Sequence, residues 1–382
     1  MGTISGAKRI LRDLKRAGYE GYIVGGAVRD YLLKRPITDV DITTNARPYQ
    51  VAKIFRTKPT GLKYGTVTVL LQKDTYEVTT YRVDGTYLDG RHPEAIAYSD
   101  SVIEDVKRRD FRINGLLMDE RGEIFDHVHG KDDLRERLIQ TIGDPVERFN
   151  EDALRMMRAF YFQAKLGFRI EEKTLRAISD HKGRLTDVAM ERIQVELIKM
   201  LKGKYAKKAI ESVVSTGVHA VLPGLKKGME YVTTMDEVPF VDAFFTLCFT
   251  LEKDVPAAWP FSNKHRHRYR TASMLANSYA SFDPVTLYTY GLDLCLLANK
   301  VSFMLKRAPN LKSRIERDFE NLPIKSELDL KVRAPELIRL LDRKPGAWLS
   351  ALQKDMVKKV LRNELKNDKD ALIEYAMKSV ND

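Results

Sequence analysis

Residues 22–30 read Tyr22-Ile23-Val24-Gly25-Gly26-Ala27-Val28-Arg29-Asp30, and residues 39–41 read Asp39-Val40-Asp41. The apolar run Gly21–Val24 predicts a short strand, and the pattern from Val28 to Leu33 predicts a helix. The chain therefore passes from strand to helix through Gly25-Gly26. Glycines at such a turn let backbone N–H groups approach a phosphate at the start of the helix, although a Gly-Gly pair alone is only a turn signal.

The two aspartates of the second stretch lie in a predicted strand, Asp39–Thr43. Because side chains alternate between the faces of a strand, both carboxylates point one way and Val40 points the other. Such a pair can chelate Mg²⁺, and two ions about 3.5–4 Å apart can activate a hydroxyl and neutralise a triphosphate. An edge strand with solvated charges gives the same alternation, so the pattern by itself leaves both interpretations open.

Two further strands are predicted at Thr66–Leu71 and Thr75–Arg82, with a tight turn at Lys73-Asp74 between them. Glu77, in the second of these, supplies a third acid if its strand lies beside Asp39–Thr43, and otherwise faces solvent. The spacing does not decide between the two.

Basic and acidic groups gather in the stretch Arg108-Arg109-Asp110-Phe111-Arg112-Ile113-Asn114. Arginine forks bind phosphate oxygens, and an aspartate can accept hydrogen bonds from ribose hydroxyls. Arg29 and Asp30 could likewise contact phosphate and brace the glycine turn, or form a surface ion pair. A charged, exposed helix face is the alternative for the whole stretch.

A helix is predicted at Asn150–Leu166, and it carries Glu151-Asp152-Ala153-Leu154-Arg155-Met156-Met157-Arg158 near its start. Asp152 and Arg155, three residues apart, share one face of that helix. An acid and an arginine fork can together read the Watson–Crick edge of a base. An ordinary surface pair at a helix N-terminus has the same spacing.

Composition sets limits on the class of protein. Lys and Arg outnumber Asp and Glu by 65 to 53, and a net charge of +12 favours an anionic partner such as nucleic acid. The cysteines are Cys248 and Cys295, too few for a disulfide framework or a zinc cluster. The longest apolar run, Phe240–Leu251, contains Asp242 and is too short to span a bilayer. We expect a cytoplasmic protein with no membrane segment.

The pattern of the chain changes near the turn Gly143-Asp144-Pro145. Strand and helix periods alternate before this turn, and nearly everything after it has helical spacing. The strongest basic cluster of the helical part lies in Asn263–Arg270, and it predicts phosphate contacts by Lys264, Arg266 and Arg268.

Taken in order, these motifs closely resemble the class II tRNA nucleotidyltransferases, which comprise CCA-adding enzymes and bacterial poly(A) polymerases. The resemblance implies an α+β fold, with a polymerase-β-like nucleotidyltransferase head built on a small mixed sheet and an all-α neck, body and tail behind it. We place the head at residues 1–142, the neck at 143–203, the body at 204–295 and the tail at 296–382.

The resemblance also implies roles for the site residues. Asp39 and Asp41 hold the metal, expected to be Mg²⁺, with Glu77 as a further catalytic acid. Arg109 and Asp110 hold phosphate and ribose, and Asp152 with Arg155 recognises CTP and then ATP. The full set expected to bind nucleotide is Gly25, Gly26, Arg29, Arg109, Asp110, Asn114, Asp152, Arg155 and Arg158.

The function implied is template-independent addition of CMP, CMP and AMP to the 3′ end of tRNA, with body and tail gripping the acceptor stem and elbow. No protein partner is expected. A loop at Asp84–Glu94 is the expected lever that changes the pocket from CTP to ATP, and it favours complete CCA addition. Two alternatives stay open: a poly(A) polymerase or A-adding enzyme of the same family, and a non-catalytic RNA-binding protein.

Overall fold

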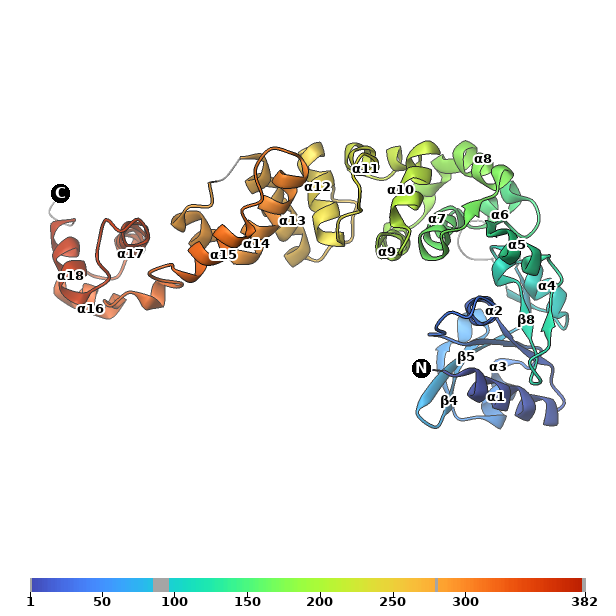
Figure 1. Cartoon of the computed structure of the whole chain (residues 1–382). Coiled ribbons are helices and arrows are strands. Elements are labelled where there is room, and N and C mark those ends of the chain that lie inside the picture. The colour runs from blue at the N-terminus through green and yellow to red at the C-terminus, as the bar shows by residue number, and fades with distance from the viewer. Residues whose placement is uncertain (1, 85–95, 279–280, 380–382) are drawn as a thin grey trace. The chain divides into compact units, whose positions relative to one another are not determined.

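The computed structural model describes residues 2–84, 96–278 and 281–379 (Figure 1). The strands are β1 (Gly21–Val24), β2 (Asp41–Thr44), β3 (Thr57–Gly61), β4 (Thr66–Leu71), β5 (Asp74–Thr80), β6 (Arg82–Asp84), β7 (Ile96–Tyr98), β8 (Leu117–Met118), β9 (Ile124–Phe125), β10 (Leu138–Ile139) and β11 (Arg169–Ile170). The lever loop expected at Asp84–Glu94 lies outside the described residues from position 85 onward, and it stays a prediction.

Helices of the first part are α1 (Ile4–Arg16), α2 (Gly26–Leu32), α3 (Pro48–Ile54), α4 (Val102–Lys107), α5 (Gly130–Glu136), α6 (Pro145–Glu151), α7 (Leu154–Leu166), α8 (Glu172–His181), α9 (Met190–Leu201), α10 (Ala206–Ser215) and α11 (Lys226–Thr233). They continue with α12 (Val241–Glu252), α13 (Asn263–Asn277), α14 (Pro284–Met304), α15 (Lys312–Glu320), α16 (Ala334–Leu340), α17 (Ala347–Leu361) and α18 (Lys369–Lys378). Short 3₁₀ turns are η1 (Leu62–Tyr64), η2 (Arg112–Asn114), η3 (Lys182–Asp187), η4 (Val218–Ala220) and η5 (Glu327–Asp329).

The principal sheet is seven-stranded in the order β3-β4-β5-β2-β1-β8-β9. Strands β2 and β5 run parallel, and the other neighbours in this sheet run antiparallel. The predicted α+β class, a small mixed sheet followed by helices, is confirmed. The register places Asp41 beside Val24 on one side and Glu77 on the other, so the centre of the sheet delivers acidic groups next to the glycine turn.

A buried apolar cluster anchors the end of β1. Val24 packs in it with Val106, Leu117, Val128 and Ile142. Because these residues come from β1, α4, β8 and the segments before α5 and α6, the point where the chain turns into α2 is held from several sides. The strand ends at Val24, as the sequence predicts, and the helix begins at Gly26, two residues before the predicted Val28.

Two local predictions for the sheet were wrong, and one strand was missed. The turn of the β4–β5 hairpin is Gln72-Lys73 rather than Lys73-Asp74, and Gln72 takes the left-handed conformation with φ 57°. The run Thr75–Arg82 is not one strand, because pairing passes from β5 to β6 at Tyr81. Strand β3 was not foreseen, because it contains Pro59, which is tolerated on an edge strand.

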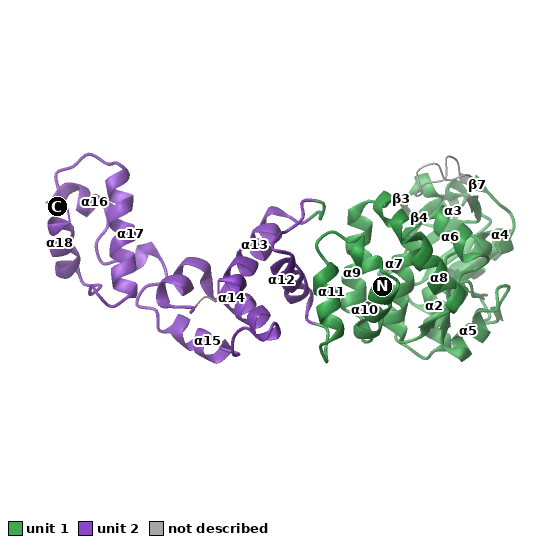
Figure 2. Cartoon of the chain, turned by 90° about the horizontal axis from the view of Figure 1, so that it is seen from above, with its two compact units in different colours: residues 1–238, 258–260 green, residues 239–257, 261–382 purple. Residues whose placement is uncertain are grey.

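The structure divides into two compact units (Figure 2). Unit 1 comprises residues 1–238 and 258–260, and unit 2 comprises residues 239–257 and 261–382. The finer division into head, neck, body and tail is not tested by these two units and stays a prediction. The change to helix after residue 143 is confirmed, and α6 begins where Asp144 accepts hydrogen bonds from Val146 N (2.9 Å) and Glu147 N (3.1 Å).

Unit 2 is held by an aromatic core between α12 and α13. Phe245, Phe249, Phe261 and Tyr269 have ring centroids 5.0–6.1 Å apart.

The same unit contains Cys248 and Cys295, and both are buried, free thiols. Across the described residues, none of the helices combines the length and the apolar character that crossing a membrane needs.

Candidate active site

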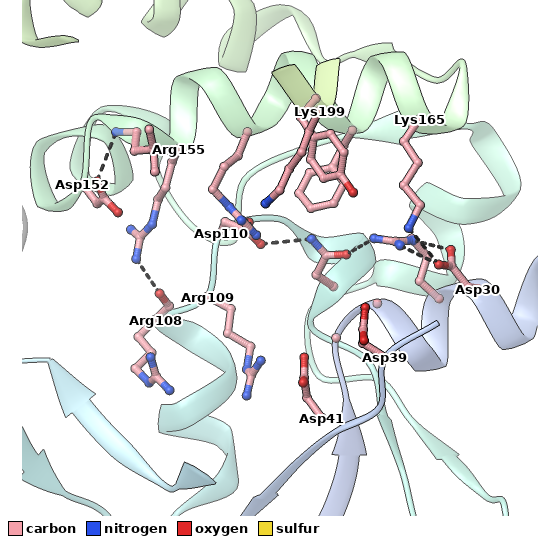
Figure 3. Close-up of a pocket in the computed structure, with 18 of the residues that line it drawn as sticks. Asp30, Asp39, Asp41, Arg108, Arg109, Asp110, Asp152, Arg155, Lys165 and Lys199 are labelled. Atoms are coloured by element: carbon pink, nitrogen blue, oxygen red, sulfur yellow. Dashed lines mark hydrogen bonds and ion pairs between the residues drawn. The ribbon is translucent and has the colours of Figure 1, made fainter. Parts of the chain in front are cut away.

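A cavity of about 570 Å³ lies within unit 1 (Figure 3). Its walls come from the β1–α2 turn, the start of β2, the α4–η2 segment, α7 and α9. Of the residues predicted from sequence, the lining includes Gly25, Gly26, Arg29, Asp39, Asp41, Arg109, Asp110, Asn114, Asp152, Arg155 and Arg158. The lining does not include Glu77 or the basic residues of α13.

The paired aspartates keep the predicted alternation, although their strand begins later than predicted. Strand β2 starts at Asp41, so Asp39 lies in the segment leading into it. Val40 is 3% exposed, whereas both aspartates are exposed and line the cavity. Figure 3 shows the two carboxylates side by side at the cavity floor. The prediction that both acids reach one site is therefore supported by the geometry.

Repulsion between acids marks this floor as a place for a cation. The pKa of the Asp41 carboxyl is raised by desolvation, by the charge of Glu77 and by that of Asp39, while Arg109 opposes the shift. Carboxylates gathered in this way gain stability from a divalent cation. Among the described residues, no cluster of three or more ligand side chains forms, so substrate phosphates and water would complete the coordination.

The strand of Glu77 lies beside the strand of the paired aspartates, as a role for Glu77 in the site requires. Strand β5 neighbours β2, and Glu77 is the register partner of Asp41. Its side chain is exposed. Its influence on the site is electrostatic, through the raised pKa of Asp41. A direct catalytic role for Glu77 stays a prediction.

Sequence reasoning missed Asp105, which holds the predicted phosphate-binding arginine. Its fully buried carboxylate accepts hydrogen bonds from Arg108 Nη2 (2.6 Å), Arg109 Nη2 (2.8 Å) and Thr43 Oγ1 (3.0 Å). Burial alone would raise the pKa of Asp105, but the charges of Arg109 and Arg108 outweigh it and lower the pKa to about 2. The spacing of four residues between Asp105 and Arg109 on a helical stretch was the available signal.

Arg109 retains capacity for an anion. Its Nε is buried and has no hydrogen-bond partner within the described part of the chain. The rest of its side chain lines the cavity and is 20% exposed, so the open part of the guanidinium can donate to a phosphate oxygen.

Asp110 is the centre of a buried hydrogen-bond network. Its Oδ1 accepts from Phe111 N (2.8 Å) and Asn114 Nδ2 (3.1 Å), and its Oδ2 accepts from Arg158 Nε (2.7 Å). Desolvation would raise the pKa of this carboxyl, but Arg158 and the hydrogen bonds lower it overall. Asp110, Asn114 and Arg158 therefore lie together, as the sequence motifs imply.

Arg29 is bound inward rather than lying on the surface. It is 1% exposed, and its guanidinium donates to both oxygens of Asp30 (2.9 Å each) and to Asn114 Oδ1 (2.6 Å). The alternative of a plain surface ion pair between Arg29 and Asp30 was therefore wrong. The pair braces the segment after the glycine turn from inside the protein.

The helix predicted at Asn150–Leu166 is confirmed from Leu154 to Leu166 as α7, but it is not continuous, because the chain leaves helical geometry at Asp152 (φ −148°, ψ 101°) after α6. Asp152 receives two hydrogen bonds from Arg192 of α9 (3.1 and 2.7 Å). Arg155 instead bonds Glu151 and the carbonyl oxygen of Arg108 (2.7 Å). Both residues line the cavity, but each is positioned by other partners and not by sharing a helix face.

The basic residues predicted to bind RNA lie on α13 in unit 2. Arg266 donates to the carbonyl oxygen of Pro256 (3.1 Å), and Arg268 pairs with Asp242 (3.1 Å) and Asp293. Lys264 is exposed. Two of the three side chains thus also stabilise the fold of unit 2, and their contacts with RNA stay a prediction.

Comparison with known proteins agrees with this arrangement. The family model described as the Poly A polymerase head domain matches residues 21–140, and that for tRNA nucleotidyltransferase domain 2 matches residues 242–376. A third, described as Probable RNA and SrmB-binding site of polymerase A, matches residues 167–229.

Similar proteins cover nearly the whole chain. The CCA-adding enzyme of Anoxybacillus flavithermus is 38% identical over 97% of this chain and 96% of its own, and that of Bacillus cytotoxicus is 37% identical over 96% of each. The crystal structure of the Bacillus stearothermophilus CCA-adding enzyme in complex with CTP superposes with a TM-score of 0.85 at 33% identity, covering 98% of this chain and 97% of that one. With this identity over its full length, and with the acids, arginines and glycine turn gathered in one cavity, the chain belongs to the CCA-adding enzyme family of tRNA nucleotidyltransferases.

Proposed function

We infer that this chain is a CCA-adding tRNA nucleotidyltransferase, which transfers CMP, CMP and AMP from CTP and ATP to the 3′ end of tRNA. The observation that carries this inference is one cavity that combines Asp39 and Asp41 with the guanidinium of Arg109. Acids for a cation and an arginine for phosphate are what nucleotidyl transfer needs.

Nucleotidyltransferases of this family depend on a divalent metal ion. We propose that Asp39 and Asp41 bind Mg²⁺, because carboxylate oxygens suit this hard cation and it retains positions for phosphate and water. When bound, the metal neutralises the triphosphate and activates the RNA 3′-hydroxyl for in-line attack. The two aspartates supply the negative charge that holds it at the cavity floor.

The phosphate and ribose contacts rest on the α4–η2 segment. Arg109 would donate to a phosphate oxygen through the part of its guanidinium that is open to the cavity. Asp110 faces a constraint, because it is 8% exposed and already accepts from Phe111, Asn114 and Arg158. A ribose hydroxyl that donates to this carboxylate would share an acceptor oxygen with one of these donors. A deoxynucleotide lacks the 2′-hydroxyl that makes this hydrogen bond, so the contact would favour a ribonucleotide.

Asp152 and Arg155 are proposed to read the base, because both line the cavity and carry the acceptor and donors that a Watson–Crick edge requires. A protein side-chain template of this kind needs no nucleic-acid template. In the described structure these groups bond Arg192 and Arg108, so a base that binds must compete with those internal bonds.

The RNA would lie along the helical part of the chain. We propose that its acceptor stem and elbow contact body and tail, with Lys264 of α13 as an exposed phosphate contact. Because the substrates are tRNA and nucleoside triphosphates, we propose that the protein works in the cytoplasm.

Labelled CTP and ATP, supplied separately with tRNA transcripts that lack CCA, CA or A, test the function. We expect CMP addition to the first two transcripts and AMP addition to the third, and growth stops at CCA. Long A tails without C incorporation would identify the A-adding alternative. Binding of tRNA without incorporation of either nucleotide would identify the non-catalytic alternative.

The variant Asp41→Asn tests the metal assignment. Because the pKa of Asp41 is raised above its ordinary 3.8, its ionised form opposes folding at neutral pH, so loss of the charge should not lower the melting temperature. Incorporation should fall by more than about 10³-fold, with tRNA affinity nearly unchanged. Asp13→Asn, on α1 and outside the cavity, is the matched control. Retained turnover in Asp41→Asn would contradict the assignment.

A further inference from the structure

One face of α7 contacts the N-terminal part of unit 1 at three successive positions. Arg158, Phe162 and Lys165 are spaced by four and three residues, so their side chains project from one face of the helix. Phe162 is 4% exposed, and the guanidinium carbons of Arg29 and Arg158 each lie 5.3 Å from its ring centroid. The ring therefore contacts two arginines, one from α2 and one from α7.

The polar residues at the two ends of this face hold one continuous chain of hydrogen bonds. At one end, Arg158 Nε donates to Asp110 (2.7 Å). At the other end, Lys165 Nζ donates to Asp30 Oδ2 (3.0 Å). Figure 3 shows the dashed connections running between Asp110 and Asp30 below α7.

The links between these two carboxylates complete the circuit. Asn114 donates to Asp110 (3.1 Å) and accepts from Arg29 (2.6 Å), which in turn donates to both oxygens of Asp30. The order is Arg158–Asp110–Asn114–Arg29–Asp30–Lys165, and α7 itself closes the ring. Removal of one member of a buried network leaves its neighbours unsatisfied, so the network favours a single geometry.

The circuit joins the two parts of the cavity that must act together. Arg29 and Asp30 follow the glycine turn and line the same cavity as the two acids proposed to bind metal. Helix α7 carries Arg155, three residues before Arg158. A second contact strengthens the far end, since Arg35 Nη2 donates to the carbonyl oxygen of Lys165 (3.0 Å). Under the proposed function, the angle of α7 would therefore set where a base lies relative to the reacting phosphate.

We propose that Lys165 is a positioning residue that fastens α7 to α2 through Asp30 and so aligns the base-reading groups with the metal-binding acids. This proposal rests on the proposed function. Lys165 has no role in the motifs from which the site was predicted. Its side chain is 29% exposed and lines the cavity, so direct binding of a phosphate is the competing role.

The two roles differ in their kinetic consequences. A loosened α7 leaves ground-state binding of CTP nearly intact but misplaces the base, so kcat and the choice of nucleotide suffer. A lost phosphate ligand weakens binding of every triphosphate alike, so KM rises and the choice of nucleotide is kept.

The test compares Lys165→Met, Lys165→Arg and wild type in CMP and AMP addition to tRNA, with UTP and GTP as wrong nucleotides. For Lys165→Met we expect kcat to fall about tenfold, KM for CTP to stay within about twofold, and relative misincorporation to rise about tenfold. Lys165→Arg keeps a charged donor and should restore fidelity and most of kcat. Lys173→Met, on the exposed face of α8, is the matched control and should behave as wild type.

Melting temperature and tRNA affinity, measured on the same samples, separate positioning from general loss of structure. If Lys165→Met folds poorly, the same kinetic parameters are measured for Lys165→Gln, with the same expected changes. A rise in KM for CTP and ATP with unchanged kcat and fidelity would overturn the proposal, as would a variant that matches wild type. Wild-type protein that adds neither nucleotide would overturn the proposed function itself.

Discussion

Asp105 holds the arginine proposed to bind the substrate phosphate, without lining the cavity itself. Its carboxylate is fully buried between Arg108, Arg109 and Thr43. Asp105→Asn removes the charge that both guanidinium groups neutralise, and we expect the free energy of unfolding to fall by about 3 kcal/mol, measured by urea denaturation. The released Arg109 should also raise KM for CTP.

The pH dependence of this effect has a definite sign. The pKa of Asp105 is about 2, below its ordinary 3.8, so its contribution to stability is present above about pH 4 and disappears as the pH falls through about 2. The stability difference between wild type and Asp105→Asn should shrink over that range. Glu104→Gln, which breaks only the exposed pair with Lys107, should change stability by less than about 0.5 kcal/mol. A constant difference at all pH values would contradict the assignment.

Some site residues could be predicted from their neighbours in the sequence, and others are placed by contacts between distant parts of the chain. Asp39 and Asp41 could be predicted because alternation along an extended segment depends only on the neighbouring residue. Arg192 could not be predicted as the partner of Asp152, because forty residues of sequence separate two groups that the fold brings within 2.7 Å. Lys165 and Asp30 were missed as partners for the same reason.

The turn between β1 and α2 depends on the conformation of Gly25. Its φ of 74° is one that side-chain-bearing residues rarely adopt, although a Cβ there would meet only Asp41 Oδ2 at 3.9 Å. Space is therefore available, and the cost of Gly25→Ala is conformational, about 1–3 kcal/mol of stability. Shifting the turn beside Asp41 should also reduce CMP incorporation. Differential scanning calorimetry with the incorporation assay measures both.

Gly183 provides the control for this substitution. A Cβ at Gly183 meets nothing within 4 Å, and its φ lies outside the left-handed range. Gly183→Ala should leave the melting temperature and incorporation close to wild type. If Gly25→Ala were equally harmless, the turn would not need its glycine.

Segments with a strong local period were predicted well, and those fixed by distant contacts were not. Strand β1 and helix α2 follow an apolar run and a pair of glycines, whereas α6 begins at Pro145, five residues before the predicted helix start at Asn150. Nothing in Glu151-Asp152-Ala153 forbids a helix, and the break there coincides with the bonds from Arg192 to Asp152. Strands of two residues, such as β8 and β9, are too short to show any period.

The cavity is built entirely from unit 1, whereas the basic cluster of α13 belongs to unit 2. Substitutions in unit 2 are therefore expected to affect nucleotide transfer through the proposed RNA binding or through the folding of unit 2. A net charge of +12 suits a long, salt-sensitive contact with RNA phosphates. The stability of unit 2 has to be measured separately if these two effects are to be distinguished.

The two cysteines offer such a measurement. Cys248 and Cys295 both belong to unit 2, and burial raises the pKa of both thiols, that of Cys295 to about 12. Because the thiolate is the form that reacts, a disulfide reagent should modify the native protein at least about 10²-fold more slowly than the denatured protein. Rapid labelling without denaturant would contradict this expectation. The labelling rate of these two thiols therefore reports the opening of unit 2, and no cysteine of unit 1 contributes to it.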